Sequence, residues 1–483
     1  MSSSTSRAET WSSRLGIWRD SDAAAVLASG TSWSGAELLA RAAGAASVLR
    51  SISAPGPVPA LLTASPTSFA FMIAGAECAR PLAPLGPRLT AAELIPCLIG
   101  LEASVLLTEA EFLPVAGEIA TVTGAEVVVI EEPATSDDQL ELDPDPLSTA
   151  FILHTSGTTG VAKAVTYRQD RLALRTRISA GLCGFEPGAV YASASPFHHI
   201  GGFGNHAVAL ASGATLVPLP RFTVESWRAL ADLGVTHALT VPTMLEMLLD
   251  AGVLALPDLE VLQYGASPIH PDTLRRTLAA IPAVRLVNLF SQTEGGPITC
   301  LTPEDHRQIA HEGRDDLLRS VGRPAAGVEL RIEDPGADGV GEVVARAAHF
   351  FAPSADGWLH TGDLGHLDPE GYLFLAGRRG DKIIRGGENI YPVEVERVLE
   401  AHSAVREAAV IGIPDQRWGE VVAAVIVAAD AEHLPDTELL RAHARSQLAG
   451  FKIPTRWAFA SSLPRNISGK LLRRELSAAD LDD

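Results

Sequence analysis

Short apolar runs alternate with helix-like stretches through most of the chain, and this alternation restricts the fold more than any other feature of the sequence. Strand-like runs occur at residues 58–63, 104–107, 126–130, 190–194, 215–219, 238–241 and 284–290. Helix-like patterns separate them at residues 34–50, 67–79, 90–100, 224–233, 242–251 and 271–281. Ser34 and Glu37 have the spacing of a capping box at the first helix. Such alternation is typical of parallel sheets covered by helices, so we predict an α/β fold.

The pattern changes after residue 328. Shorter strand-like runs at 328–332, 341–346 and 372–375 are joined by glycine turns and predict a small β-rich subdomain. A charged, glycine-containing link at 377–380 then precedes helix-like stretches at 392–401 and 438–448 and a buried strand at 421–429. We therefore predict an N-terminal domain at residues 1–378, a hinge at 379–380 and a small, mobile α+β C-terminal domain at 381–483.

The charge balance restricts the partners. The 483-residue chain has 38 Lys+Arg against 58 Asp+Glu, a formal charge of -20, which disfavours non-specific binding to nucleic acid or anionic membranes. The first residues lack an apolar signal region, and no apolar run is long enough to span a bilayer. We expect a cytoplasmic protein without a membrane span. The four cysteines show neither metal-ligand nor CxxC spacing and are expected to be buried thiols.

A candidate phosphate-binding loop follows the strand-like residues 151–154. The loop offers hydroxyl donors, glycines that let backbone N–H groups approach an anion, and one ammonium group. These are Thr155, Ser156, Thr158 and Thr159, then Gly157 and Gly160, and finally Lys163. It is not a Walker loop, because the two glycines are too close together and no GK[ST] follows. A plain turn rich in serine, threonine and glycine is the alternative interpretation.

Lysine is rare in this sequence. It occurs only at Lys163, Lys382, Lys452 and Lys470, which leaves 38 − 4 = 34 arginines. A chain that prefers arginine so strongly should keep lysine where a compact ammonium on a flexible stem is needed. All four lysines are therefore candidate functional residues, with chance retention as the alternative.

Placed in order, these segments resemble the adenylate-forming enzymes: acyl- and aryl-CoA synthetases, firefly luciferase and the adenylation domains of peptide synthetases. The resemblance runs from about Trp33 to Arg474. It is carried by TSGTTGVAK at 155–163, SPFHH at 195–199, GASP at 265–268, NLFSQTE at 288–294, WLHTGD at 358–363, Arg378, RGGENIYP at 385–392, LAGFKIP at 448–454 and PRNISGK at 464–470. Four features depart from the family: Ala162 replaces proline, Ser291 replaces glycine, Gly380 replaces the common lysine or aspartate, and residues 347–356 lack the customary Gly-Tyr-Trp segment.

The resemblance implies roles for individual residues. ATP and AMP would be bound by the phosphate loop, Gly265, Ala266, Asn288, Phe290, Thr293, Asp363 and Arg378, with Asp363 and Arg378 at the ribose. Thr158 and Glu294 would hold Mg²⁺, and Lys470 would catalyse adenylation. His199, Ser267 and Ser291 would line the acyl pocket. Gly386, Gly387, Phe451 and Lys452 would line the coenzyme A tunnel, and Gly380 would be the hinge. A metal site at His198 and His199 is disfavoured, since no acidic or cysteine residue lies nearby at ligand spacing.

The resemblance also implies a two-step reaction. A carboxylate attacks the α-phosphate of MgATP to give acyl-AMP and pyrophosphate, and a thiol then displaces AMP. No amino-acid anchor is visible at 197–199 and no carrier-protein domain follows Asp483, so coenzyme A is the expected acceptor. A separate carrier protein is the second possibility, and a non-catalytic nucleotide-binding relative is the third. The acid and the oligomeric state are left open.

Overall fold

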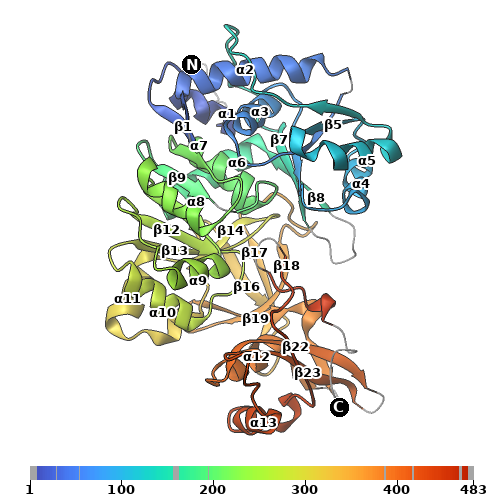
Figure 1. Cartoon of the computed structure of the whole chain (residues 1–483), viewed down its shortest axis with the longest axis vertical. Helices are drawn as coiled ribbons and strands as arrows, with labels where there is room; N and C mark the ends of the chain where they lie inside the picture. Colours follow the sequence, from blue (N-terminus) through green and yellow to red (C-terminus); the bar gives the residue numbers. More distant parts are fainter. Residues whose placement is uncertain are drawn as a thin grey trace, which may run out of the picture. The chain divides into compact units, whose positions relative to one another are not determined.

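The computed structural model describes residues 8–28, 30–53, 55–155, 163–193, 195–385, 388–415, 418–466 and 470–476. The chain divides into two compact units (Figure 1). The first unit is Met1–Glu329 with Arg346–Leu359, and the second is Leu330–Ala345 with His360–Asp483. Strands and helices alternate through the first unit, which confirms the α/β class. The domain and hinge boundaries given above stay predictions.

A nine-stranded sheet occupies much of the first unit. Its order is β15-β14-β13-β12-β11-β9-β10-β1-β2. The strands are β1 (Ala24–Ala28), β2 (Thr31–Ser34), β9 (Val190–Ser193), β10 (Thr215–Pro218), β11 (His237–Thr240), β12 (Val261–Gly265), β13 (Arg285–Gln292), β14 (Gly296–Leu301) and β15 (Arg323–Pro324). Neighbours from β13 to β1 are parallel, and the strands at both edges are antiparallel. The parallel sheet predicted from the alternation is therefore present.

A six-stranded sheet completes the first unit. Its order is β6-β5-β3-β4-β7-β8. The strands are β3 (Val58–Leu61), β4 (Leu82–Leu85), β5 (Val105–Thr108), β6 (Glu126–Val129), β7 (Thr149–Thr155) and β8 (Lys163–Arg168). All neighbours are parallel except β7 and β8, which form an antiparallel hairpin at the edge.

Helices cover these sheets. They are α1 (Trp11–Arg14), α2 (Gly35–Ser51), α3 (Pro66–Glu77), α4 (Ala91–Gly100), α5 (Leu113–Thr123), α6 (Gln169–Cys183), α7 (Asn205–Leu210), α8 (Val224–Arg228), α9 (Pro242–Asp250), α10 (Pro271–Ala280) and α11 (Pro303–Glu312). Ser34 caps α2 by accepting the Glu37 N–H at 3.2 Å, while the Glu37 carboxylate accepts from Arg41. Of the two hydrogen bonds of the predicted capping box, the structure therefore shows the one accepted by Ser34, while the Glu37 side chain bonds to Arg41 instead. No helix within the described ranges has the length and apolar character needed to cross a membrane.

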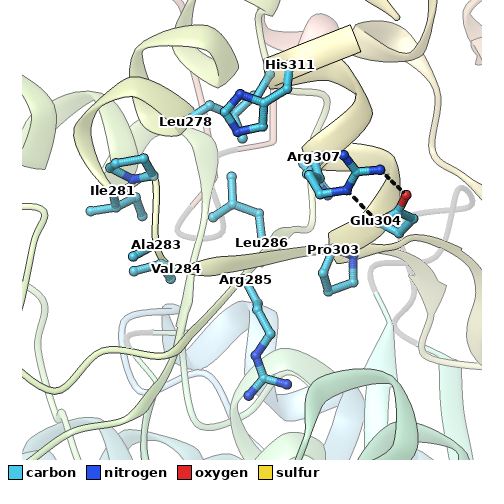
Figure 2. A pocket seen from close by; sticks show the side chains of 13 residues that line it. Leu278, Ile281, Ala283, Val284, Arg285, Leu286, Pro303, Glu304, Arg307 and His311 are labelled. Atoms are coloured by element: carbon cyan, nitrogen blue, oxygen red, sulfur yellow. Dashed lines mark hydrogen bonds and ion pairs between the residues drawn. The ribbon is translucent and has the colours of Figure 1, made fainter.

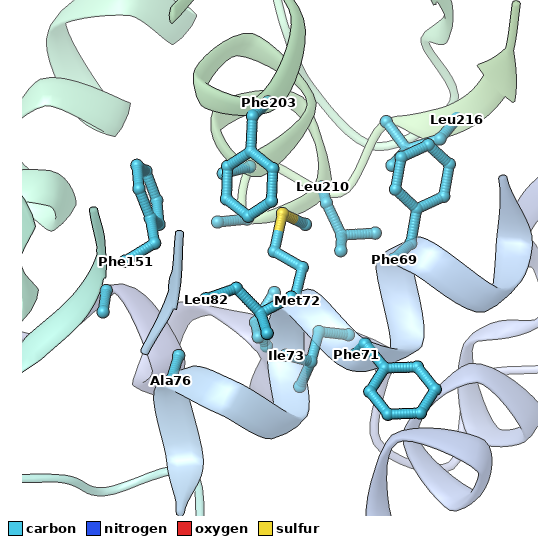
Figure 3. Close-up of a cluster of buried hydrophobic side chains, with 14 of the residues drawn as sticks. Phe69, Phe71, Met72, Ile73, Ala76, Leu82, Phe151, Phe203, Leu210 and Leu216 are labelled. Carbon is cyan, nitrogen blue, oxygen red and sulfur yellow. The ribbon is translucent and has the colours of Figure 1, made fainter. Parts of the chain in front are cut away.

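One hydrophobic core joins the two sheets of the first unit. Figure 3 shows Phe69 and Met72 of α3 beside Phe203, Leu210 and Leu216. Leu216 belongs to β10 of the nine-stranded sheet, and Phe203 and Leu210 lie in the helical segment that precedes this strand. The core also contains Phe151 of β7, from the other sheet. Each fully buried side chain of this size contributes about 1.5–3 kcal/mol relative to exposure. The shared core therefore fixes the two sheets, and the loops they carry, in one body.

The second unit contains two smaller sheets. The first has the order β16-β17-β18-β19, formed by β16 (Glu329–Glu333), β17 (Gly341–Arg346), β18 (Leu359–Leu367) and β19 (Leu373–Arg378). The second joins β20 (Ile383–Arg385), β21 (Glu388–Ile390), β22 (Val405–Asp415), β23 (Gly419–Ala428) and β24 (Arg456–Phe459), with α12 (Pro392–Glu400) and α13 (Thr437–Arg445). The link predicted at 377–380 begins inside β19 and continues into the 3₁₀ turn η6 (Arg379–Asp381). It is therefore a structured connection.

Candidate functional site

Three of the segments that carry predicted nucleotide and acyl residues follow neighbouring strands of the nine-stranded sheet. β9, β11, β12 and β13 are parallel neighbours, so their carboxyl ends meet at the same edge, where ligands of open α/β sheets bind. β9 leads to residues 195–199, β12 to 265–268 and β13 to 290–294. Gly265 pairs directly with Leu289. Three of the predicted motifs, far apart in the sequence, therefore leave one side of this sheet.

The turn after β12 has an unusual backbone. Ala266 adopts a left-handed conformation with φ of 70°, which residues with a Cβ atom rarely adopt outside sites that impose it. A Cβ on Gly265 would lie 3.0 Å from the carbonyl oxygen of Leu289, so glycine permits the close approach of β12 and β13. Asn288 donates from Nδ2 to the Tyr264 carbonyl at 3.2 Å. The asparagine predicted at the nucleotide thus also ties the two strands below the turn.

Two segments hold the backbone of the Thr293–Glu294 turn. The Tyr167 hydroxyl donates to the Thr293 carbonyl. The N–H groups of Phe351 and Ala352 donate to the Glu294 carbonyl at 2.8 Å and 3.1 Å. The rings of Tyr167 and Phe351 are 3.9 Å apart between centroids. The segment 347–356, which departs from the family pattern, therefore holds the backbone of the predicted magnesium ligand by hydrogen bonds.

The phosphate loop joins the two strands of the β7–β8 hairpin. Thr155 and Lys163 are directly paired at the end of this hairpin, and the Lys163 side chain is exposed. Ser156, Gly157, Thr158, Thr159, Gly160 and Ala162 lie outside the described residues. Because Tyr167 belongs to β8, its bond to Thr293 connects the hairpin to the turn that carries Glu294.

Two histidines stand where the acyl pocket is predicted. The rings of His198 and His199 are 4.1 Å apart between centroids. Burial lowers the pKa of His199 to about 4 and lowers that of His198 well below its usual range, with further contributions from His199 and Arg88. Both imidazoles are thus neutral near pH 7. A Cβ on Gly86 would lie 2.9 Å from Nε2 of His198, so glycine at the end of β4 leaves room for this ring.

Arg175 is a residue that the sequence reasoning missed. Its side chain is fully buried, donates to the Gly204 carbonyl at 3.2 Å and to Oδ1 of Asn205 at 2.9 Å, and forms no ion pair with any carboxylate in the described residues. A Cβ on Gly296 would lie 3.2 Å from its Cδ. Burial lowers the pKa of this guanidinium. Arg175 therefore supports the turn after Glu294 from the core.

The predicted ribose-binding pair and the candidate catalytic lysine belong to the second unit. Asp363 and Arg378 are cross-strand partners on β18 and β19, with Nε of Arg378 2.6 Å from Oδ1 of Asp363. Asp363 is 6% exposed. Lys470 is exposed, and the partial loss of water around its ammonium lowers its pKa; Arg378 lowers it further, while Asp363 and Asp381 oppose this change. The structure thus places Lys470 within electrostatic range of the Asp363–Arg378 pair.

The residues directly before and after Gly380 each form an ion pair. Arg379 is 2.8 Å from Glu342 of β17, and Asp381 is 3.3 Å from Arg473. Glu342 also lies near Glu333 and His360, a group whose spacing could accept a metal ion. The two carboxylates of that group are already paired, with Arg379 and with Arg331. We therefore interpret the group as an ion-pair network at the predicted hinge.

Of the predicted thiol-tunnel residues, Phe451 and Lys452 lie in the 3₁₀ turn η7 (Gly450–Lys452). Lys452 donates to both carboxylate oxygens of Glu394 at 2.7 Å. Arg385 donates to the Phe451 carbonyl at 2.7 Å. Gly386 and Gly387 lie outside the described residues.

A cavity of about 420 Å³ occupies a different place in the first unit. Figure 2 shows Ile281 and Leu286 on its walls and Arg307 turned towards Glu304. It is formed by α10, α11 and the beginning of β13, whereas residues 290–294 lie at the other end of that strand. None of the predicted site residues lines it, so it is not the candidate site.

Comparison with known proteins agrees with the motif order. The family model for AMP-binding enzymes matches residues 18–352, and the model for the AMP-binding enzyme C-terminal domain matches residues 394–470. A fatty acid–[acyl-carrier-protein] ligase, ScoC, from Streptomyces coeruleorubidus is 35% identical, with 82% of this chain and 81% of that protein covered. An indoleacetate–CoA ligase from Aromatoleum aromaticum is 34% identical, with 71% and 69% covered. The ATP-bound structure of MatB from Rhodopseudomonas palustris is 27% identical, with a TM-score of 0.86 and 97% and 98% covered.

Proposed function

Because the chain belongs to the family of AMP-binding enzymes and is an AMP-forming acid–thiol ligase, we propose that it converts a carboxylic acid to its acyl-AMP with MgATP and transfers the acyl group to coenzyme A. The observation that carries this proposal is the gathering of Lys470, Asp363 and Arg378 in the second unit. An ionised carboxylate can accept hydrogen bonds from both ribose hydroxyls, and the ammonium can stabilise charge at the α-phosphate.

The first step needs no covalent nucleophile from the protein. A carboxylate oxygen of the acid bonds to the α-phosphorus while the bond to pyrophosphate breaks. The carboxylate of the acid and the phosphates of ATP are both anions and must be held together for this attack. We assign this to Lys163, Thr155 and the loop between them. Glu294 fits a magnesium ligand, because its carboxylate is only half-buried and forms no ion pair within the described part of the chain. Mg²⁺ bound by Glu294 and Thr158 would neutralise phosphate charge.

In the second step a thiolate attacks the acyl carbonyl carbon, and the bond to AMP breaks. Phe451, Lys452, Gly386 and Gly387 are the residues we assign to the thiol path, and Gly380 is the proposed pivot. A carrier protein is the second candidate acceptor, because the ScoC ligase that is 35% identical to this chain acts on one. Parallel assays with coenzyme A and with a phosphopantetheinylated carrier protein separate the two, since the preferred acceptor should give the higher rate.

The residues assigned to the acyl pocket favour an uncharged acyl group. His199 is neutral near pH 7, and Ser267 and Ser291 carry no charge, so none of them would form an ion pair with a second carboxylate or an amine. We therefore expect aliphatic or aromatic monocarboxylic acids to be preferred. A panel of aliphatic, aromatic, polycyclic and charged acids, screened by pyrophosphate release, identifies the class. Preference for a dicarboxylate or an amino acid would contradict this assignment.

The role of Lys470 is tested by Lys470→Ala. We expect adenylation to fall by two to three decades or more, about 3–4 kcal/mol, because a charge directed at the transition state is lost. Thioester formation from supplied acyl-AMP should be largely retained, since that step does not use the lysine. Pyrophosphate release and thioester formation are measured separately. Pyrophosphate release within about fivefold of the unmodified protein would exclude this role.

A further inference from the structure

Lys470 lies where residues 464–466 pair with residues 470–472. Residues 465 and 471 form an antiparallel bridge, and the Leu472 N–H donates to the Pro464 carbonyl at 2.9 Å. Asn466 is bonded to Lys470 twice, since its N–H donates to the Lys470 carbonyl at 2.9 Å and its Oδ1 accepts the Lys470 N–H at 2.8 Å. These bonds set the shape of the segment but do not attach it to the rest of the second unit.

Two arginines attach this segment, one on each side of Lys470. Arg473 donates from one terminal nitrogen to both carboxylate oxygens of Glu396 at 2.7 Å, and its other terminal nitrogen donates to Asp381 at 3.3 Å. Arg465 donates to Glu407 at 2.7 Å. Glu396 belongs to α12 and Glu407 to β22, so each arginine reaches a different element.

The Arg473–Glu396 pair is the less exposed of the two attachments. The Glu396 side chain is 10% exposed and that of Arg473 is 20% exposed, against 29% and 32% for Glu407 and Arg465. Glu396 also accepts the Val410 N–H at 2.8 Å, which holds its carboxylate in place. Charge-assisted hydrogen bonds of this kind fix the geometry of the pair, and removing one partner would leave a poorly hydrated charge uncompensated. Arg473 therefore binds a carboxylate that is itself fixed.

We propose that Arg473, with Arg465 in a secondary role, is a positioning residue that holds the Lys470 segment on α12 and β22 in the orientation needed for adenylation. This inference rests on the proposed function, because it assigns Arg473 an effect on the first half-reaction through Lys470. The contact with Asp381 places the same guanidinium beside the predicted hinge. Displacement of a catalytic group by about 1 Å can cost a hundredfold in rate, so a contact that fixes this segment matters for the chemistry.

The experiment compares three variants in the full-length protein. Arg473→Gln removes the charge, Arg473→Lys keeps the charge but lacks the planar fork, and Arg441→Gln is the matched control, because Arg441 pairs with Glu438 on the surface of α13. Acid-dependent pyrophosphate release reports adenylation, thioester formation from supplied acyl-AMP reports the second step, and melting temperature reports folding. Arg473→Gln should lose about a hundredfold in adenylation and stay within about threefold in thioester formation.

A second readout separates positioning from simple stability. Desolvation and Arg378 are the main causes that lower the pKa of Lys470, and Arg473 adds a smaller contribution, so Arg473→Gln should move the alkaline limb of the adenylation profile slightly to higher pH. Arg473→Lys should leave that limb in place and recover part of the rate. Glu396→Gln should reproduce the loss of adenylation, and the double variant with Arg473→Gln should lose little more, since contacting residues are not additive.

The outcomes distinguish this inference from the proposed function. If the unmodified protein releases pyrophosphate with none of the acids offered, the proposed function fails. If it is active and depends on Lys470, but Arg473→Gln adenylates within about threefold of it, only the positioning role fails. Equal loss in both half-reactions also overturns the role. If Arg473→Gln does not fold, Arg473→Lys and Glu396→Gln decide by the same two half-reactions.

Discussion

Glu294 is the side chain whose chemistry is most easily isolated, because its backbone is held by Phe351 and Ala352 and would stay in place when the carboxylate is changed. Glu294→Gln should raise the Mg²⁺ concentration for half-maximal adenylation by about tenfold to a hundredfold, since a neutral amide is a poor ligand for a hard dication. The assay is pyrophosphate release across a magnesium titration. Glu304→Gln, an exposed carboxylate paired with Arg307 on α11, is the matched control. Unchanged metal dependence would remove Glu294 from the site.

Single residues could be predicted from the sequence where they lie in local motifs. Asp363, Glu294 and Lys470 each stand in a run of neighbours that indicates a role. Residues that act through distant partners could not be predicted in this way. Arg175 lies on a helix with Arg171 and Arg177 and is fully buried, with Gly204 and Gly296 from elsewhere in the chain leaving room for its side chain. The Arg473–Glu396 contact spans 77 positions, and neither residue's neighbours indicate the other.

Carboxylates packed between α12 and β22 predict that the stability of the folded protein depends on pH. Burial, together with Glu396 and Glu407, raises the pKa of Glu400 from 4.5 to about 7, while the Ala408 N–H and Arg465 oppose this change. A raised folded-state pKa gives stability that is present below pH 4.5 and is lost as the pH rises through 7. The stability lost through ionisation of Glu400 is ~3 kcal/mol at most, because Glu400 titrates together with the neighbouring carboxylates.

The corresponding variant is Glu400→Gln, in which the amide oxygen can still accept the Ala408 N–H. Its melting temperature should exceed that of the unmodified protein at pH 8, and the difference should shrink as the pH falls towards 5. Glu438→Gln, at an exposed position on α13, should show no such trend. A gain that is the same at pH 5 and pH 8 would show that Glu400 does not titrate differently in the folded state.

Helices and strands could be predicted from the sequence where their hydrophobic residues recur with a regular period. The strand at 341–346 and the helices near 242–251 and 392–401 appear where they are expected, with ends that differ by a residue at most. β12 went unpredicted because Gln263 interrupts its apolar run, although that side chain is only 5% exposed in the sheet. The helix predicted at 224–233 is α-helical only to Arg228 and continues as a 3₁₀ turn to Leu233. Tertiary packing decides both cases.

For the whole molecule, the pivot predicted at Gly380 has ion pairs on both sides of it in the sequence. Arg378 and Arg379 are paired with residues of β18 and β17, whereas Asp381 is paired with Arg473 of the C-terminal segment. A rotation between these two groups of partners would therefore be absorbed at Gly380. A Cβ there would meet nothing within 4 Å, so glycine is not required for space. Its value would be backbone freedom during the rotation.

Gly380→Pro tests this pivot, because proline fixes φ near about -65°, a value compatible with the 3₁₀ turn η6, and restricts rotation. A fixed φ should hold the C-terminal segment in one of its two poses. We expect one half-reaction to stay within about tenfold of the unmodified protein and the other to fall by at least about two decades. Gly380→Ala, which keeps the N–H and fits without contact, should leave both half-reactions nearly unchanged. Equal losses in both half-reactions of a folded Gly380→Pro variant, or no loss in either, would place the pivot elsewhere.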